Sequence, residues 1–166
     1  TNQLVQFMQS GGATYLDLRD NTSDGQLIIR GKGGDTATER LRIDSSGRVL
    51  IGTTTEGFAE ADDLTINSAD HGGITIRTPT NKEGNIAFSD TTSGTGEYSG
   101  LIRYRHSQND LGLWTNSNLR LLIDSTGQVL PGTDDSQNLG SSTKRWANIY
   151  AADMHYSNEG GKNTVD

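Results

Sequence analysis

The sequence predicts an all-β protein of short strands and hairpins, with little or no helix. Three observations lead to this prediction. Gly, Thr, Asp, Ser and Asn supply 83 of the 166 residues, and these residue types favour turns and short strands over helices. The apolar residues fall in short alternating clusters, as in strands with one buried face. A strand–turn–strand pattern also occurs twice along the chain.

The repeated pattern appears when residues 40–53 are placed over residues 120–133, since the two stretches are identical at 10 of 14 positions. In each copy, alternating apolar residues precede an Asp-Ser-Ser/Thr-Gly sequence, and a second apolar stretch follows it. Asp can accept backbone hydrogen bonds within a turn, and Gly can adopt a positive φ. We therefore predict two β-hairpins whose structural turn residues are Asp44, Gly47, Asp124 and Gly127.

Further strand candidates alternate with turn residues at intervals of about 8 to 12 residues, as in other β proteins of short strands. They are residues 15–19, 26–30, 64–66, 73–77, 85–88, 101–105 and 111–114. The repeat predicts a first β repeat module over residues 1–61, a second over 62–135 and a separate C-terminal module over 136–166. Because the sequence begins at Thr1 rather than Met, we expect it to be part of something longer.

The apolar content of the chain is low for a protein that folds alone. Hydrophobic residues make up 31% of the sequence and aromatic residues 6%, so one copy has little material for a core. Disordered chains share this shortage, but they lack alternating apolar clusters. Identical neighbours can complete the buried surface instead. We therefore expect an extended assembly of identical chains.

Charge and composition exclude several classes of function. The net charge is −7, whereas nucleic acids and anionic membrane surfaces require clustered positive charge. The sequence contains no Cys, which excludes disulfides, zinc–thiolate sites and thiol catalysis. No stretch is apolar over the length that a membrane helix needs. We expect no nucleic-acid partner and no membrane insertion.

The residues also resemble a known family. Residues 41–53 look like the recurrent strand–turn–strand motif of bacteriophage tail fibres, and residues 139–151 are similar to a segment near the C-terminal ends of those fibres. Together with residues 153–161, the latter segment looks most like fibres of phages related to the cyanophage group. The resemblance implies a parallel homotrimer that forms an elongated fibre packed between chains. It makes residues 136–166 a C-terminal fibre module.

This resemblance implies a virion protein of the distal phage tail, with host attachment as its function. The chain would mediate receptor binding or support the receptor-binding tip. Its partners would be other tail proteins and a bacterial cell-surface receptor, for which a glycan is favoured. One alternative is part of a tailspike that degrades polysaccharide. Another is an adhesin of a bacterial surface or of an injection system.

No pattern of catalytic or metal-binding residues supports the enzyme alternative. Adjacent carboxylates on a strand point to opposite sides, whereas glycoside hydrolysis needs two that face each other. The acidic pairs are Asp62 with Asp63 and Asp134 with Asp135. The three histidines, His71, His106 and His155, lack the close spacing of metal ligands. We predict a protein that is not an enzyme, with no catalytic residue, no metal and no cofactor.

Aromatic side chains remain as candidates for binding, because ring faces stack on sugars. Tyr98, Tyr104 and Trp114 lie in or beside polar loops, and we assign them as receptor-binding candidates, with packing between subunits as the alternative. Trp146 and Tyr150 are assigned to structure.

Overall fold

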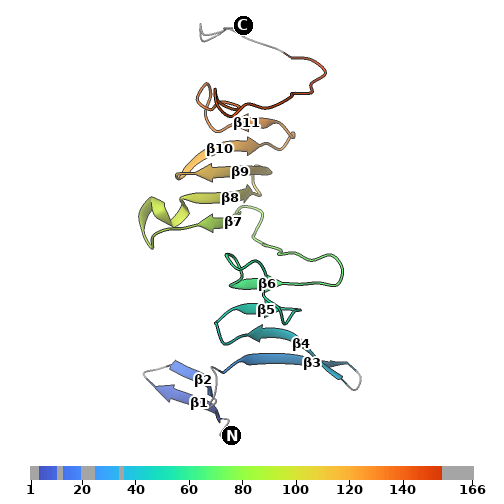
Figure 1. Ribbon diagram of the computed structural model, residues 1–166. Helices are drawn as coiled ribbons and strands as arrows, with labels where there is room; N and C mark the ends of the chain where they lie inside the picture. Colours follow the sequence, from blue (N-terminus) through green and yellow to red (C-terminus); the bar gives the residue numbers. More distant parts are fainter. Residues whose placement is uncertain (1–3, 11–12, 20–24, 34–35, 155–166) are drawn as a thin grey trace. The chain divides into compact units, whose positions relative to one another are not determined.

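A computed structural model of the chain describes residues 4–10, 13–19, 25–33 and 36–154 (Figure 1). Only the backbone is described for residues 4–10 and 13–19 and for residues 32, 33 and 36. The chain divides into two compact units, Thr1–Thr75 and Ile76–Asp166. Each unit contains β-sheet, and the described part has no α-helix. The predicted all-β class is therefore confirmed.

Unit 1 contains a hairpin and a four-stranded sheet. The hairpin consists of β1 (Leu4–Ser10) and β2 (Ala13–Arg19). The sheet has the order β3 (Leu27–Gly33), β4 (Thr36–Ile43), β5 (Val49–Ile51) and β6 (Leu64–Ile66). Strands β3, β4 and β5 pair antiparallel, whereas β5 and β6 pair parallel. The parallel pair requires a crossover, which residues 52–63 provide.

Unit 2 is built on a five-stranded antiparallel sheet in which neighbours in sequence are neighbours in space. Its strands are β7 (Glu83–Phe88), β8 (Gly100–Arg105), β9 (Asp110–Thr115), β10 (Asn118–Ile123) and β11 (Val129–Pro131). A short 3₁₀ helix, η1 (Gly94–Tyr98), lies between β7 and β8. Residues 132–154 follow β11 without a further strand.

Most strand candidates predicted from the sequence coincide with observed strands, but the prediction for residues 73–77 is wrong. That segment forms no strand, because no described strand of this chain pairs with it. The boundary between the two compact units follows Thr75, whereas the repeat predicts the first boundary after residue 61. The difference arises because β6 pairs with β5 and so belongs to the sheet of unit 1.

Very few large side chains are buried within one chain. Among the described hydrophobic residues, only Leu50 and Leu101 are buried, with 1% and 9% of their surface exposed. The chain exposes 13927 Å² in total. A compact monomer of its 17.9 kDa mass exposes about 8,000 Å². The single chain thus leaves much apolar surface in contact with water.

The two repeated hairpins share one turn geometry. The Asp44 carboxylate accepts hydrogen bonds from the backbone N–H groups of Ser46 (2.9 Å) and Arg48 (3.0 Å). Asp124 accepts the equivalent bonds from residues 126 (2.8 Å) and 128 (3.0 Å). Gly47 and Gly127 have φ values of 84° and 87°. These values lie in the left-handed region, where a Cβ atom is disfavoured.

We expect replacement of Gly127 by Val to destabilise the protein by about 1 kcal/mol or more per chain, because Val resists a positive φ. Since no atom lies within 4 Å of a Cβ built on Gly127, backbone strain alone would cause the loss. Thermal unfolding measures the effect. Gly127→Asn is the control and should lose less, because Asn tolerates this conformation. Equal melting temperatures for Gly127→Val and the parent would contradict the geometry.

Candidate functional site

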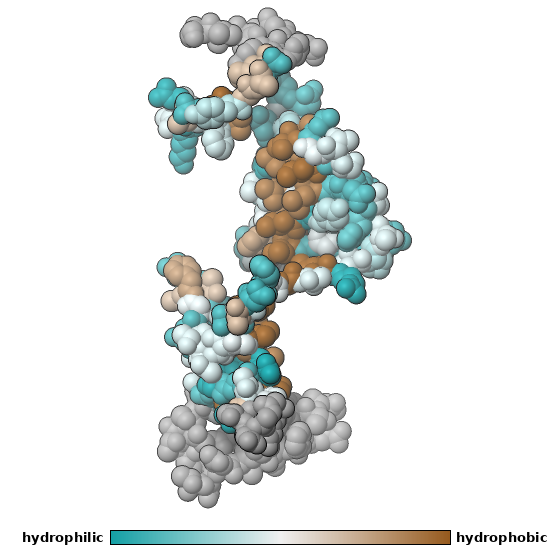
Figure 2. All heavy atoms as spheres, turned by 90° about the vertical axis from the view of Figure 1, so that its right-hand side faces the viewer, coloured by the Kyte–Doolittle hydropathy of each residue, from teal (hydrophilic) through white to brown (hydrophobic). Residues whose placement is uncertain are grey.

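The sheet of unit 2 has one apolar face. Directly paired residues lie on the same face, and register places one apolar row across all five strands. The row consists of Ile86, Ile102, Leu113, Leu121 and Pro131. A second row on this face contains Tyr104, Leu111, Ile123 and Val129. Figure 2 shows apolar residues gathered in a stripe at the level of this sheet. We call these two rows the apolar face of unit 2.

This face is uncovered in the single chain. Ile86 exposes 49% of its surface, Leu113 40% and Val129 64%. Isolated exposed apolar residues are ordinary, but a contiguous apolar patch marks a site of interaction. The apolar face of unit 2 is therefore a candidate binding surface.

Unit 1 carries an apolar face of the same kind. Register aligns one row across its four-stranded sheet, Ile29, Leu41, Ile51 and Ile66, and a second row, Leu27, Ile43, Val49 and Leu64. Ile29 and Leu64 expose 51% and 50% of their surfaces. We call these two rows the apolar face of unit 1.

The sequence repeat explains why both units have such a face. Side chains alternate between the two sides of a strand, so residues two apart share a face. In each repeat the turn brings the apolar residues of its two strands opposite each other. Ile43 pairs with Val49 in the first repeat, and Ile123 pairs with Val129 in the second. Both repeats also contain a register shift one residue before the paired leucine, at Arg40 and Arg120. The repeat thus encodes a sheet with one apolar face.

The opposite face of unit 1 is covered and polar. Thr65 lies on this face beside Leu50, and its Oγ1 accepts a hydrogen bond from Gly57 N–H in the crossover (3.0 Å). Arg48 Nη1 donates to Asp62 Oδ2 across 2.9 Å, which also holds the crossover to the hairpin turn. Hydrogen bonds to Asp44 and Asp62 raise the pKa of Arg48. The crossover therefore covers the side of the sheet that lacks the apolar rows.

Ion pairs and one aromatic ring occupy the opposite face of unit 2. The Arg103 guanidinium lies 4.1 Å from the centre of the Trp114 ring, and its Nη1 is 3.2 Å from Glu83 Oε2. Arg105 Nε donates to Asp110 Oδ1 across 2.7 Å, and this hydrogen bond raises the pKa of Arg105. Asp110 itself is only 5% exposed. Side chains on this face therefore contact one another within the single chain.

The three aromatic candidates for receptor binding do not form one site. Tyr98 lies in η1 with 40% of its surface exposed. Tyr104 belongs to the apolar face of unit 2, where its ring meets His106 edge-on with 5.1 Å between centroids. Trp114 pairs with Leu101, three residues from Tyr104 along β8, so it lies on the opposite face. Arg103 covers one side of its ring.

Trp146 and Tyr150, assigned to structure from the sequence, lie outside the strands and expose 63% and 94% of their surfaces. One chain does not supply the packing expected for them.

The acidic pairs contain residues with structural roles. Asp62 accepts a hydrogen bond from Arg48, and Asp135 has a φ of 48° in a turn. Within the described ranges, no group of three or more His, Asp or Glu side chains could hold a metal ion. In that same part of the chain, no helix has the length and apolarity needed to cross a membrane.

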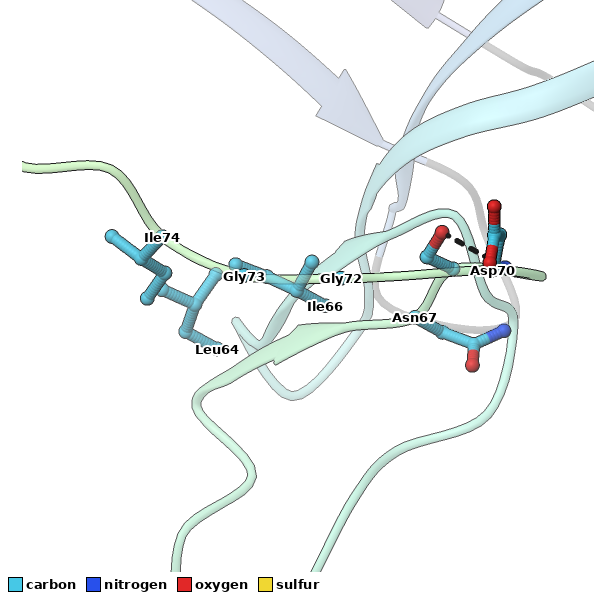
Figure 3. Close-up of a pocket in the computed structure, with 8 residues that line it drawn as sticks. Leu64, Ile66, Asn67, Asp70, Gly72, Gly73 and Ile74 are labelled. Atoms are coloured by element: carbon cyan, nitrogen blue, oxygen red, sulfur yellow. Dashed lines mark hydrogen bonds between the residues drawn. The ribbon is translucent and has the colours of Figure 1, made fainter.

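Each unit also has a shallow groove that continues from its apolar face. The groove of unit 1, about 490 Å³, lies between β6 and residues 72–74, and Figure 3 shows Ile74 beside Leu64 at its end. The groove of unit 2, about 240 Å³, has Ile76, Ile86 and Ile102 among its lining residues. The groove of unit 2 is mainly apolar, whereas Asn67, Ser68 and Asp70 add polar groups to the lining of the groove of unit 1. Both are open grooves rather than enclosed pockets.

The turn carboxylates give the hairpins a pH dependence. The Arg48 guanidinium, hydrogen-bonded to Asp44, lowers the pKa of that carboxyl below its usual 3.8. For Asp124, the Thr126 hydroxyl and the backbone N–H of Gln128 lower the pKa in the same direction. A carboxyl whose pKa is lower in the folded state stabilises the fold fully above its unfolded pKa. That stabilisation is lost as the pH falls through the folded pKa.

We therefore expect the melting temperature to fall as the pH drops below about 4, the range in which Asp44 and Asp124 begin to protonate. Thermal unfolding between pH 7 and pH 2 measures this. The control is Asp124→Asn, which still accepts hydrogen bonds but does not titrate, so its decline should be shallower. A parent and variant with parallel pH profiles would show that Asp124 does not contribute.

The sequence did not predict which residues together form the apolar face of unit 2. It showed the alternating residues of the repeats, but not the row formed by Ile86, Ile102 and Leu113, because that row depends on the register of β7, β8 and β9. The available signal was alternation within the strand candidates at 85–88, 101–105 and 111–114. Alternation identifies a face within each strand but not which faces coincide.

No family model and no curated protein matches this sequence. Among solved structures, the chain is similar to the carboxy-terminal domain of the bacteriophage T5 L-shaped tail fibre, with a TM-score of 0.40 and 11% identity over 94% of this chain and 87% of that one. It is also similar to that domain with its intra-molecular chaperone domain, with a TM-score of 0.40 and 12% identity over 99% of this chain and 63% of that one. A likeness of this extent supports no argument about function.

Proposed function

We propose that the chain is a structural and host-adhesion segment of a phage tail fibre, in which three parallel copies bury their apolar faces against one another. The motif over residues 41–53 supports the fibre assignment by its resemblance. The two exposed apolar faces support assembly, and they are the observation on which the proposal chiefly depends.

The amount of exposed surface favours an assembly over a monomer. The chain exposes 13927 Å², roughly 6,000 Å² more than a compact monomer of its mass. Permanent assemblies bury about 2,000 to 5,000 Å² or more of largely apolar surface. Burial of the two apolar faces between copies would remove exposed apolar side chains such as Ile86 and Val129 from water. It also compensates for the small core of each chain, which contains Leu50 and Leu101.

The distribution of charge indicates which side faces outward. The ion pairs Arg48 with Asp62 and Arg105 with Asp110 lie opposite the apolar faces. The arginines of both pairs keep about a quarter to a third of their side-chain surface in water, at 25% for Arg48 and 30% for Arg105. Burial between chains would remove this water and cost desolvation free energy. In the assembly the apolar faces would therefore lie inside and the charged faces outside.

This orientation separates the aromatic candidates. Tyr104 would be buried between chains, and the guanidinium of Arg103 already covers one side of the Trp114 ring. Tyr98, in η1 and off both apolar rows, would remain accessible to a receptor. Three copies on one fibre would strengthen weak binding by avidity, about a hundredfold or more.

Binding to purified lipopolysaccharides and capsular polysaccharides from candidate hosts, measured by surface plasmon resonance, tests the adhesive role. We expect binding without release of new reducing ends, and we expect Tyr98→Ala to weaken it while Tyr98→Phe retains it. Polysaccharide turnover would contradict the proposal in favour of a depolymerase. If no polysaccharide of the panel binds at any concentration, the adhesive part of the proposal fails.

A further inference from the structure

Residues 72–78, between β6 and β7 in the sequence, have the pattern of a strand without its pairing. Ile74 and Ile76 alternate with Thr75 and Arg77, and they expose 69% and 45% of their surfaces. No backbone group of this segment is hydrogen-bonded to any described residue. The Oγ1 atom of Thr78 is buried and also has no partner among the described residues.

The segment continues the apolar faces. Ile74 lies beside Leu64 and Ile66 in the groove of unit 1 (Figure 3). Ile76 lines the groove of unit 2, and its Cγ2 is 3.5 Å from a Cβ built on Gly84 of β7. The isoleucines of the segment therefore lie on the same sides as the rows that the assembly would bury. Any chain that covers those rows would also meet this segment.

A free strand edge of suitable length is present on every copy. Among the described strands, β7 pairs with β8 alone, so one edge of Glu83–Phe88 offers N–H and C=O groups that no described strand pairs. The free edge of β6 spans only Leu64–Ile66. An extended peptide binds an exposed edge by main-chain hydrogen bonds, with alternate side chains fitting the face beside it. The edge of β7 matches the length of residues 72–78 better than that of β6.

The opposite charges of Arg77 and Glu83 also favour pairing of residues 72–78 with β7. Arg77 has no ion pair with a described residue. Glu83, at the start of β7, pairs with Arg103 but keeps 42% of its side chain exposed, so its carboxylate remains accessible to a second arginine. In the single chain residues 72–78 are not hydrogen-bonded to β7, so the edge of β7 is left open to the same segment of a second copy.

We propose that residues 72–78 become a β-strand only in the assembled protein, by pairing with the free edge of β7 in a second copy of the chain. The proposal rests on the assembly proposed above and names its second interface. Each copy donates one strand and accepts one, so the sheets are joined through backbone hydrogen bonds as well as apolar contacts. An exchanged strand also gives the sequence pattern at 73–77 the partner that the single chain lacks.

Hydrogen–deuterium exchange on the full chain tests this proposal. In the assembly, we expect the amides of residues 72–78 to exchange at least a hundredfold more slowly than in an unpaired peptide, and the outward amides of β7 to be protected as well. If the protein is an oligomer but residues 72–78 exchange at the unpaired rate, strand exchange is wrong and the assembly stands. If the protein is a monomer, both proposals fail.

Cross-linking between copies tests whether residues 72–78 pair with the edge of β7. Since the chain has no Cys, Thr75→Cys chains can be refolded together with Asn85→Cys chains and treated with a short thiol-specific cross-linker. Thr75 alternates with the isoleucines, and Asn85 alternates with Ile86, so both would lie on the outward side of the joined sheet. We expect heterodimers at several times the yield obtained from Thr75→Cys with Ser125→Cys. Equal yields would overturn pairing at β7.

Discussion

Replacement of Ile102 by Asp is expected to dissociate the assembly into single chains. Ile102 lies in the row of the apolar face of unit 2, paired with Ile86 on one side and Leu113 on the other. Each copy would bring one carboxylate into an apolar interface, where an unpaired buried charge costs several kcal/mol, about 3 or more. Sedimentation velocity at micromolar concentration would show the loss of mass.

Phe58→Asp is the matched control for this variant. Phe58 exposes 70% of its surface and lies in the crossover of unit 1, which covers the side opposite the apolar rows. The same chemical change at this position should leave the assembly intact, because the new charge stays in water. If Ile102→Asp retains the parent mass, the apolar face of unit 2 is not an interface.

Replacement of Gly52 by Ala is expected to destabilise the fold by about 2 to 4 kcal/mol per chain. Gly52 has a φ of 71°, and a Cβ on it would lie 2.3 Å from the carbonyl oxygen of Asn67. The backbone at Asn67 is held in place, because its N–H donates to the Ile51 carbonyl across 2.9 Å. The left-handed conformation contributes about 1 kcal/mol of the loss, and overpacking contributes about 1 to 3 kcal/mol. Denaturant unfolding measures the total.

Gly47→Ala separates these two contributions. Gly47 also has a positive φ, but no atom lies within 4 Å of a Cβ built on it. It should therefore lose only the part that comes from backbone strain, about 1 kcal/mol. Equal losses for the two variants would show that the Asn67 carbonyl moves aside without cost.

Local features were predictable from the sequence because their causes are local. The alternation in residues 40–53 and 120–133 specifies strands, and the Asp and Gly of each turn specify hydrogen bonds and a positive φ. Pairing over longer distances was not predictable in this way. The parallel pairing of β5 with β6 depends on a crossover, and nothing in the sequence of residues 52–63 shows where that crossover returns.

The candidate site was predicted less well, because it depends on register. Tyr104 and Trp114 looked alike as aromatic residues beside polar loops, yet the pairing of β8 with β9 places them on opposite faces. The strand expected at residues 73–77 has the right alternation but no partner within the chain. A sequence pattern records that a segment can pair, but not which chain supplies the partner.

The molar mass of the protein in solution tests the central claim most directly. Multi-angle light scattering on the chain at micromolar concentration should give about three times the 17.9 kDa of a single copy. This mass is the one expected if the exposed rows that contain Ile86, Ile102 and Leu113 are buried between three copies. A mass of one chain, stable on concentration, would contradict the proposed assembly and the fibre role that depends on it.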